Sequence, residues 1–147
     1  MKETNMVFYL HDLFISKNAT AVPVAKRSKE ATVTDFGTLM VIDDAVTEGP
    51  KKTSAQVGRA QGIYVNSALD GSSMHLAFSI IFTNSTYNGS TLEIQGADRY
   101  LLNRREVSIV SGTGAFRLAK GYAVLETVYF SSSSNGVIKI IVTVYHY

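Results

Sequence analysis

The sequence predicts an all-β protein, folded as an eight-stranded antiparallel up-and-down β-barrel with a central ligand cavity. Three observations support this prediction: eight short stretches have strand patterns, the connections carry turn residues, and no segment shows a sustained helical period. Eight strands joined by short hairpins close naturally into a barrel, and a β-sandwich is the competing architecture. The expected strands span 6–13, 34–44, 56–67, 73–83, 90–97, 105–111, 121–131 and 137–146.

The connections between these stretches contain dipeptides that are typical of hairpins. Asp70-Gly71, Asn88-Gly89 and Asn135-Gly136 each lie between two expected strands. Asn, Asp and Gly tolerate the positive φ that tight hairpins require. One turn of helix is expected between Gly112 and Lys120, so the remaining chain forms a sequential meander.

Composition limits the class of protein. The chain has 147 residues, enough for one domain over 1–147, and its 46% hydrophobic and 18% charged residues exclude disorder. The net charge of +2 is spread without a basic block, so no nucleic-acid partner is expected. No apolar run reaches about 18 residues, so no membrane span is expected. Residues 1–5 do not have the pattern of a signal peptide.

The chain contains no cysteine, which excludes disulfides, thiolate nucleophiles and cysteine-bound metals. Its histidines, at 11, 75 and 146, lack metal-ligand spacing, so no metal is expected. Gly112-Thr-Gly114 lacks the context of a phosphate-binding loop and is interpreted as a turn, and no serine-hydrolase elbow occurs. No cofactor is therefore expected.

Three glycosylation sequons, at Asn18, Asn84 and Asn88, favour a secretory route despite the absence of cysteine. All three fall in expected turns.

The first expected strand ends in an acid on its apolar face. Met6, Phe8, Leu10 and Asp12 share one face because side chains alternate along a strand. Three of the four are apolar, so this face is expected to look inward. A carboxylate at its end favours a lined cavity over a filled core.

Other polar residues fall at strand ends, where they are expected to line one mouth of the barrel. Asp98 follows one strand and Arg105 begins the next. An acid in an apolar pocket has a raised pKa and can donate a proton near neutrality, while Tyr and Arg orient phenolic or carbonyl oxygens. Tyr64 shares a strand face with Asn66, and Thr127 shares one with Tyr129. Taken singly, each is more often structural.

Two further segments are given structural interpretations. Asp43-Asp44 is interpreted as a capped strand end that enters a Gly-Pro turn. The last strand, 137–146, is apolar on both faces except at Lys139, Thr143 and His146, which predicts a subunit interface that covers Ile138, Ile140 or Val142.

The chain resembles the plant dirigent protein family over nearly its whole length, with matching segments in the same order. These segments are Phe8-Tyr-Leu-His-Asp12, the 37–50 segment with Ile42-Asp-Asp44, Arg59-Ala-Gln-Gly-Ile-Tyr64, Gln95-Gly-Ala-Asp98, Arg105-Glu-Val-Ser-Ile-Val-Ser-Gly-Thr-Gly114, Phe116-Arg-Leu-Ala-Lys-Gly-Tyr122 and Tyr145-His-Tyr147.

This resemblance implies a barrel of the lipocalin or allene oxide cyclase type, assembled as a homotrimer and secreted to the apoplast as a glycoprotein. A separate oxidase, a laccase or peroxidase, makes phenoxy radicals from monolignols, and the dirigent protein directs their stereoselective coupling to optically active lignans. A related branch, the pterocarpan synthases, dehydrates an isoflavanol. A quinone methide beside an acid is common to both. A third alternative is a non-catalytic carrier of a phenolic ligand.

The resemblance also implies roles for individual residues. Asp12 and Asp98 match the acids that protonate or polarise a quinone methide, Tyr64 and Arg105 match residues that position phenolic oxygens, and Thr127 matches a pocket threonine. The expected set is Asp12 and Asp98 as catalytic acids, with Tyr64, Asn66, Arg105, Thr127, Phe8 and Tyr129 as substrate-binding residues.

Several positions depart from the lignan-forming pattern. Asn66 stands where an aromatic is usual, Ile42-Asp-Asp44 replaces Phe-Asp, and Arg99 and Tyr100 follow the Gly-Ala-Asp segment. These departures favour the broader, non-classical branch of the family.

Overall fold

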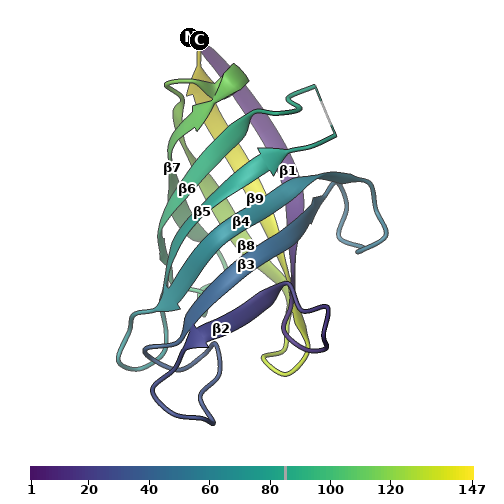
Figure 1. Ribbon diagram of the computed structural model, residues 1–147. Helices are drawn as coiled ribbons and strands as arrows, with labels where there is room; N and C mark the ends of the chain where they lie inside the picture. Colours follow the sequence, from purple (N-terminus) through teal and green to yellow (C-terminus); the bar gives the residue numbers. More distant parts are fainter. Residues whose placement is uncertain (85) are drawn as a thin grey trace.

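The computed structural model describes residues 1–84 and 86–147, in which nine strands and one short 3₁₀ helix are found (Figure 1). The elements are β1 (Lys2–Leu13), β2 (Ala21–Ala25), β3 (Leu39–Thr47), β4 (Gln56–Asn66), β5 (Met74–Phe82), β6 (Thr91–Asp98), β7 (Arg105–Thr113), η1 (Gly114–Phe116), β8 (Lys120–Phe130) and β9 (Asn135–His146).

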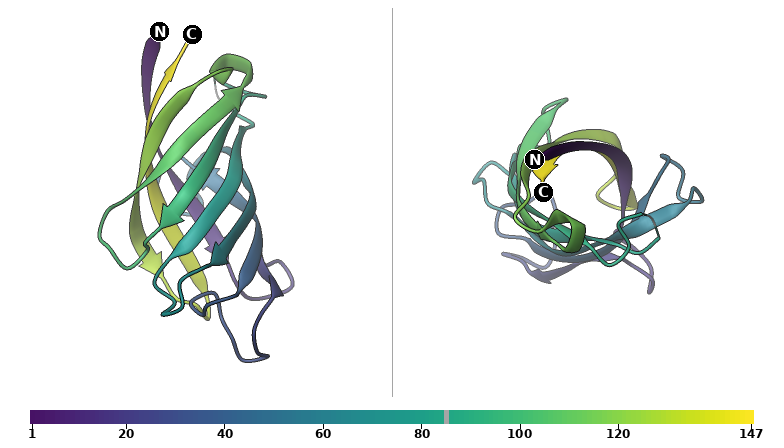
Figure 2. Two further views of the ribbon diagram at one scale, coloured as in Figure 1. Left: turned by 90° about the vertical axis from the view of Figure 1, so that its left-hand side faces the viewer. Right: turned by 90° about the horizontal axis from the view of Figure 1, so that it is seen from above.

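Eight of these strands, β1 and β3 to β9, form a closed antiparallel barrel. Successive strands from β3 to β9 pair with one another, and β1 pairs with β9 along its whole length. The ring closes where β1 also pairs with β3, from Tyr9 opposite Thr47 to His11 opposite Ala45, as the end-on view in Figure 2 shows. This arrangement confirms the predicted barrel and excludes the sandwich.

Alternation of side chains divides each strand between the interior and the surface. In β5 every second residue is buried, because successive side chains point to opposite faces. Large apolar residues occupy the inward positions, which is why the period-two pattern identified this strand from sequence. The buried residues of β5 are Met74, Leu76, Phe78, Ile80 and Phe82.

The strand that sequence reasoning missed is β2, which pairs only with β3. It has five residues, and Pro23 in its centre demotes the segment in a sequence-based assignment. Proline is tolerated at a sheet edge, where its missing N–H leaves no partner unsatisfied. The strand expected at 34–44 also lies further along the chain than predicted: β3 begins at Leu39 and continues to Thr47.

Aromatic side chains fill the interior at the end of the barrel that carries the two chain termini. Phe116, from η1, lies at the centre of this cluster, with ring centroids 5.7 Å from Phe82, 4.8 Å from Tyr87 and 5.0 Å from His146. Phe8 packs edge-on against Phe82. The predicted helical turn is thus confirmed as η1, which inserts Phe116 into the core.

The predicted location of the outward apolar surface on β9 is wrong. Ile138, Ile140 and Val142 all lie on the inward face of β9, where Ile140 is opposite the buried Phe8 of β1 and Leu125 of β8. The outward positions of β9 mix apolar and polar side chains: Val137, Lys139, Ile141, Thr143 and Tyr145. Because the sequence of β9 is apolar along most of its length, it does not show which of its residues face inward and which face outward.

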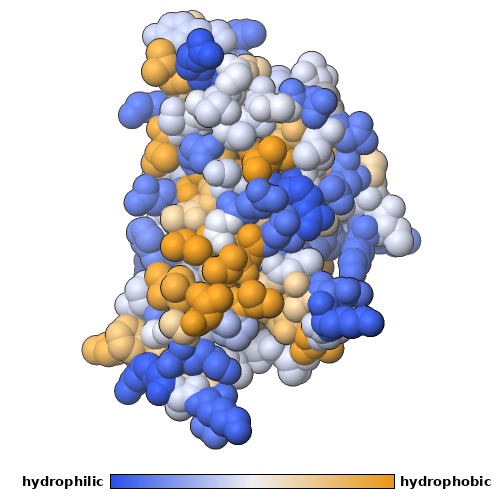
Figure 3. All heavy atoms as spheres, in the orientation of Figure 1, coloured by the Kyte–Doolittle hydropathy of each residue, from blue (hydrophilic) through white to orange (hydrophobic). Residues whose placement is uncertain are grey.

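An apolar row instead crosses the outside of β2 to β5. Val22 lies opposite Val41, Val41 opposite Ile63, and Ile63 opposite Ala77, so four neighbouring strands contribute one residue each. Val22, Val41 and Ile63 are each 40% exposed, and Figure 3 shows hydrophobic residues gathered on this face. We call Val22, Val41, Ile63 and Ala77 the β2–β5 patch.

In the described part of the chain, no helix is long and apolar enough to cross a membrane.

Replacing Phe8 with alanine is expected to destabilise the barrel by about 3–5 kcal/mol, because the ring is buried and the cavity left behind cannot collapse fully. Val7 is the matched control, since it is 50% exposed on the outward face of the same strand. Val7→Ala should cost less than about 1 kcal/mol. Urea unfolding of both variants measures the difference, and equal losses would contradict the inward placement of Phe8.

Candidate functional site

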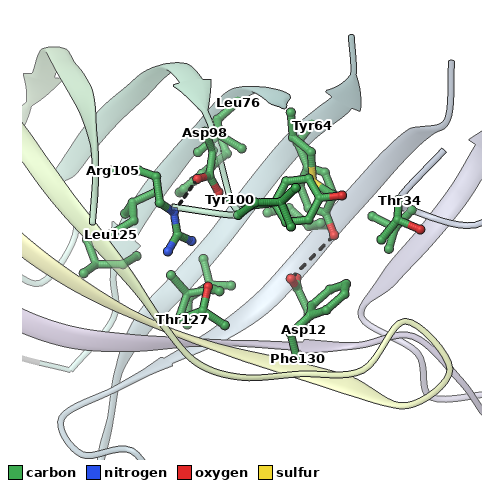
Figure 4. Close-up of a pocket in the computed structure, with 18 residues that line it drawn as sticks. Asp12, Thr34, Tyr64, Leu76, Asp98, Tyr100, Arg105, Leu125, Thr127 and Phe130 are labelled. Atoms are coloured by element: carbon green, nitrogen blue, oxygen red, sulfur yellow. Dashed lines mark hydrogen bonds and ion pairs between the residues drawn. The ribbon is translucent and has the colours of Figure 1, made fainter. Parts of the chain in front are cut away.

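A cavity of about 390 Å³ opens at the end of the barrel opposite the aromatic cluster. Its size falls within the range of about 300–1,000 Å³ that is typical of small-molecule sites. Most of its wall is apolar, with Leu10, Ile42 and Leu76 among the contributing residues. The polar residues that line it are Asp12, Thr34, Tyr64, Asp98, Tyr100, Arg105 and Thr127 (Figure 4).

The structure brings Asp12 and Tyr64 together across the cavity wall. Asp12, near the end of β1, is 8% exposed, and the Tyr64 hydroxyl on β4 donates a long hydrogen bond of 3.5 Å to Asp12 Oδ2 (Figure 4). Burial, reinforced by the neighbouring carboxylates, raises the pKa of Tyr64 well above its usual value, so its hydroxyl remains a donor. Burial also raises the pKa of Asp12, which favours the protonated acid.

Asp98 and Arg105 form a second polar pair in the cavity. Arg105 Nε donates to Asp98 Oδ1 at 2.7 Å, and Arg105 Nη1 donates to the carbonyl of Leu102 at 3.3 Å. The Arg105 Nη2 group is buried and has no hydrogen-bond partner among the described residues. Because guanidinium N–H groups suit phenolic and carbonyl oxygens, this unused donor is a candidate contact for a ligand oxygen.

The structure also brings Asp44 beside Asp12, a proximity that sequence reasoning missed. The predicted strand end at Asp43-Asp44 is wrong, because β3 continues to Thr47 and Asp44 is fully buried. Burial, followed by the charge of Asp12, raises the pKa of Asp44 well above its usual value. The missed signal was alternation: Met40, Ile42 and Val46 share the inward face with Asp44, as Phe8 and Leu10 do with Asp12.

Three residues predicted to bind substrate lie outside the cavity. Phe8 belongs to the aromatic cluster at the far end, because it lies two residues before Leu10 on β1. The side-chain amide of Asn66 donates instead to the carbonyls of Gly71 and Val33, at 2.9 and 3.3 Å, and so ties two loops together.

Tyr129, the third of them, is 51% exposed and does not line the cavity as Thr127 does, so the expectation that the two share a face is wrong. A bulge between Thr127 and Tyr129 interrupts the alternation of β8. Phe130 consequently takes the place at the cavity.

The asparagines of the three sequons are exposed, as glycan attachment requires. Asn18 lies in the β1–β2 connection, and Asn84 and Asn88 lie in the β5–β6 connection. Ser85, the central residue of the Asn84 sequon, lies outside the described residues. Elsewhere in the chain, over 1–84 and 86–147, no cluster of three His, Asp or Glu side chains is arranged to hold a metal ion.

Comparison with known proteins identifies the family. A family model described as "Dirigent-like protein" matches residues 3–145, so the chain belongs to the dirigent family. Dirigent protein 1 of Arabidopsis thaliana is 41% identical over 127 residues, which are 86% of this chain and 70% of that protein. Pterocarpan synthase 1 of Glycyrrhiza echinata is 34% identical over 151 residues, covering 99% of this chain and 79% of that protein.

Solved structures agree with this assignment. The pterocarpan synthase dirigent protein GePTS1 matches with a TM-score of 0.93 at 34% identity, over 99% of this chain and 86% of that chain. PsPTS1, also a pterocarpan synthase dirigent protein, matches with a TM-score of 0.93 at 33% identity, over 99% and 96% of the two chains. Pyocyanin demethylase, at 14% identity and a TM-score of 0.60, shares the fold alone.

Replacing Arg105 with glutamine is expected to destabilise the protein by about 3–5 kcal/mol at neutral pH, because it leaves the Asp98 carboxylate buried without its partner. Arg104 is the matched control, since it pairs with Glu126 at the surface. Arg104→Gln should cost about 0–1 kcal/mol. Urea unfolding measures both variants. A small, equal loss in the two would show that the Asp98–Arg105 pair is solvated in solution.

Proposed function

We propose that this dirigent protein binds a phenolic compound in the cavity and converts it through a quinone methide, with Asp12 as the proton donor. The observation that carries the proposal is an acid with a raised pKa on the wall of an apolar cavity, in contact with the Tyr64 hydroxyl. A buried acid whose pKa is raised is suited to protonate a leaving group. Tyr64 and Arg105 supply donors for the oxygens of the ligand.

The chemistry that fits this site best is the loss of water from a hydroxylated phenolic such as an isoflavanol. Asp12 gives its proton to the hydroxyl group, whose C–O bond breaks with the electron pair leaving on water. The phenol loses its proton to solvent, and its electrons form the quinone methide. A second phenolic oxygen then attacks the methide carbon and returns its proton to Asp12, while the quinone oxygen regains a proton. The net change is the loss of one water, without an oxidant. The names of the pterocarpan synthase relatives support this choice.

Stereoselective coupling of phenoxy radicals is the second candidate function. It is favoured by the presence of two separate polar pairs in one cavity, Asp12 with Tyr64 and Asp98 with Arg105. Each pair offers hydrogen bonds to the oxygen of one phenol, so two radicals would be held with defined faces together. A separate laccase or peroxidase would remove the electrons, for example from monolignols on the way to optically active lignans.

We also propose that the protein is secreted to the apoplast, glycosylated at the three exposed asparagines, and assembled as a homotrimer. The exposed sequons and the β2–β5 patch support these proposals. A patch that crosses four strands is a suitable surface for contact between identical subunits.

Replacing Asp12 and Asp98 separately and together with asparagine tests the acid assignment. Loss of a general acid is expected to slow dehydration by about 10²–10⁴-fold, while ligand binding is retained. Asp43→Asn is the control, because Asp43 faces outward and pairs with Arg59. Chiral chromatography of products from an isoflavanol without oxidase, and from a monolignol with laccase, measures both candidate reactions.

The same measurement separates the alternatives. Turnover without oxidase identifies the dehydratase, and a changed enantiomer ratio only with oxidase identifies the coupling function. Full product yield and an unchanged enantiomer ratio in the Asp12→Asn, Asp98→Asn variant would refute the acid assignment. Binding of the phenol with no effect on any product would leave only the carrier function.

The trimer is expected to have about three times the 16.0 kDa mass of the chain in light scattering at micromolar concentration. Ile63→Lys, at the centre of the β2–β5 patch, should yield monomers because a charge buried without a partner is costly. Val110→Lys is the control, since Val110 has similar exposure on β7, outside the patch. A monomeric parent chain, or dissociation by Val110→Lys and not by Ile63→Lys, would contradict the proposal.

A further inference from the structure

Barrel closure places two carboxyl groups opposite each other. The β1–β3 pairing ends with His11 opposite Ala45, and the next step of the same register sets Asp12 opposite Asp44. Both side chains point inward, Asp12 beside Leu10 and Asp44 beside Ile42. Directly opposite side chains on antiparallel strands have Cβ atoms about 4.5–5.5 Å apart, and like charges at such positions repel. The influence that each carboxyl group has on the pKa of the other agrees with this proximity.

No cation of the described residues is placed to neutralise this pair. Arg105 is bound to Asp98, and Arg59, whose charge reaches Asp44 only weakly, makes its ion pair with Asp43 on the outer surface. His11 points away from the cavity and is hydrogen-bonded to Thr47. Two ionised carboxylates at this point would therefore repel each other in an apolar surrounding, which is unfavourable.

Most of the oxygens of the two carboxyl groups also lack a hydrogen-bond donor. Asp12 Oδ1 and both oxygens of Asp44 have no donor of good geometry among the described residues. The Thr20 hydroxyl approaches Asp44 but is directed at the carbonyl of His11. Two carboxylates only accept hydrogen bonds, so contact between them is favourable only when one carries a proton.

We propose that Asp12 and Asp44 share one proton at neutral pH, and that Asp44 is a positioning residue that keeps a proton available on the cavity wall. Asp12 lines the cavity, whereas Asp44 lies behind it and is completely buried. The pair therefore acts as one unit: when Asp12 gives a proton to the ligand, Asp44 is the nearest group that can replace it. This inference deepens the proposed function and rests on it for its catalytic meaning. The shared proton itself is a property of the free protein.

The other groups that face the pair have opposite effects on the pKa values of the two acids. Tyr64 donates to Asp12 and favours its ionised form, and Thr20 and Arg59 do the same for Asp44. The charge of Asp98, across the cavity, favours protonation of Asp12. Gly136, which lies opposite Asp12 on β9, contributes no side chain. Burial is the largest effect on both acids, and their influence on each other comes next: Asp44 lowers the pKa of Asp12, whereas the charge of Asp12 raises the pKa of Asp44. Because the two acids titrate as a pair, removing Asp44 should change the titration of Asp12.

The test is a carboxyl ¹³C NMR titration of Asp12 in the full chain without ligand. In the parent protein we expect Asp12 to titrate above the ordinary Asp value of about 3.9. Asp44→Asn removes the acid with which Asp12 shares the proton and leaves an amide donor in its place, so the midpoint should fall by about one pH unit or more. Asp43→Asn, the same change at the next position of β3, should leave it unchanged. An Asp12 midpoint that is the same in Asp44→Asn and the parent, or that is ordinary in the parent, would overturn the shared proton.

Coupling is reciprocal, which provides a second variant if Asp44→Asn does not fold. In Asp12→Asn the midpoint of Asp44 should fall in the same way, and an unchanged Asp44 midpoint would overturn the proposal. With substrate, the high-pH limb of activity, which reports ionisation of the acid, should move to lower pH in Asp44→Asn, so that activity lost at pH 7 returns on acidification. A uniform loss at all pH values would assign Asp44 a structural role only. A shifted titration in a parent chain with no turnover would refute the proposed reaction and leave the shared proton intact. Turnover by a parent chain in which Asp12 titrates with an ordinary midpoint would support the proposed reaction and refute the shared proton.

Discussion

Closure of the barrel through β1 is the constraint on which the rest of the structure depends. This strand pairs with β9 along its full length and with β3 over three residues, so the first and last thirds of the chain are joined at one seam. Once the register of this seam is fixed, alternation decides which side chain of every strand faces inward. A shift of one residue would turn Asp12 outward and place His11 in the cavity. The position of the acid is therefore a consequence of strand register.

The two ends of the barrel interior have different roles. At one end, Phe116 and the rings around it fill the barrel and supply buried apolar surface. At the other end, the side chains leave a cavity in which polar groups are held in pairs. Burial strengthens the interactions within each pair, because charges and hydrogen bonds are stronger where water is excluded. The filled end supplies the stability that a hollow end with buried acids lacks.

Much of this arrangement could be predicted from the sequence because it follows from alternation. The pattern Met6, Phe8, Leu10, Asp12 placed an acid on an inward face, and the spacing of turn dipeptides gave the hairpin order. The inward path of β8 could not be predicted, because the bulge at Thr127 replaces Tyr129 by Phe130 without a sequence signal. Nor could the short β2, in which Pro23 conceals an edge strand.

The proximity of Asp44 to Asp12 depends on a pairing between strands that are not consecutive in the meander. Local patterns do not contain such a contact, although the alternation of β3 would have placed Asp44 inward. The residues in the cavity were thus more predictable than the partners behind them, because facing inward is a property of one strand and contact is a property of two.

The cavity is built from two kinds of segment, and this division has a consequence for how such a protein can change. The acids, Tyr64 and Arg105 belong to strands whose positions are fixed by the hydrogen-bonded ladder. Thr34 and Tyr100 come from the connections before β3 and before β7, and Tyr100 donates to the carbonyl of Gly71 in a third loop. Insertions or exchanges in these loops would reshape the entrance while the strands keep the reacting groups in place. One barrel of this kind can therefore acquire a new ligand by replacement of its rim, without rebuilding its chemistry.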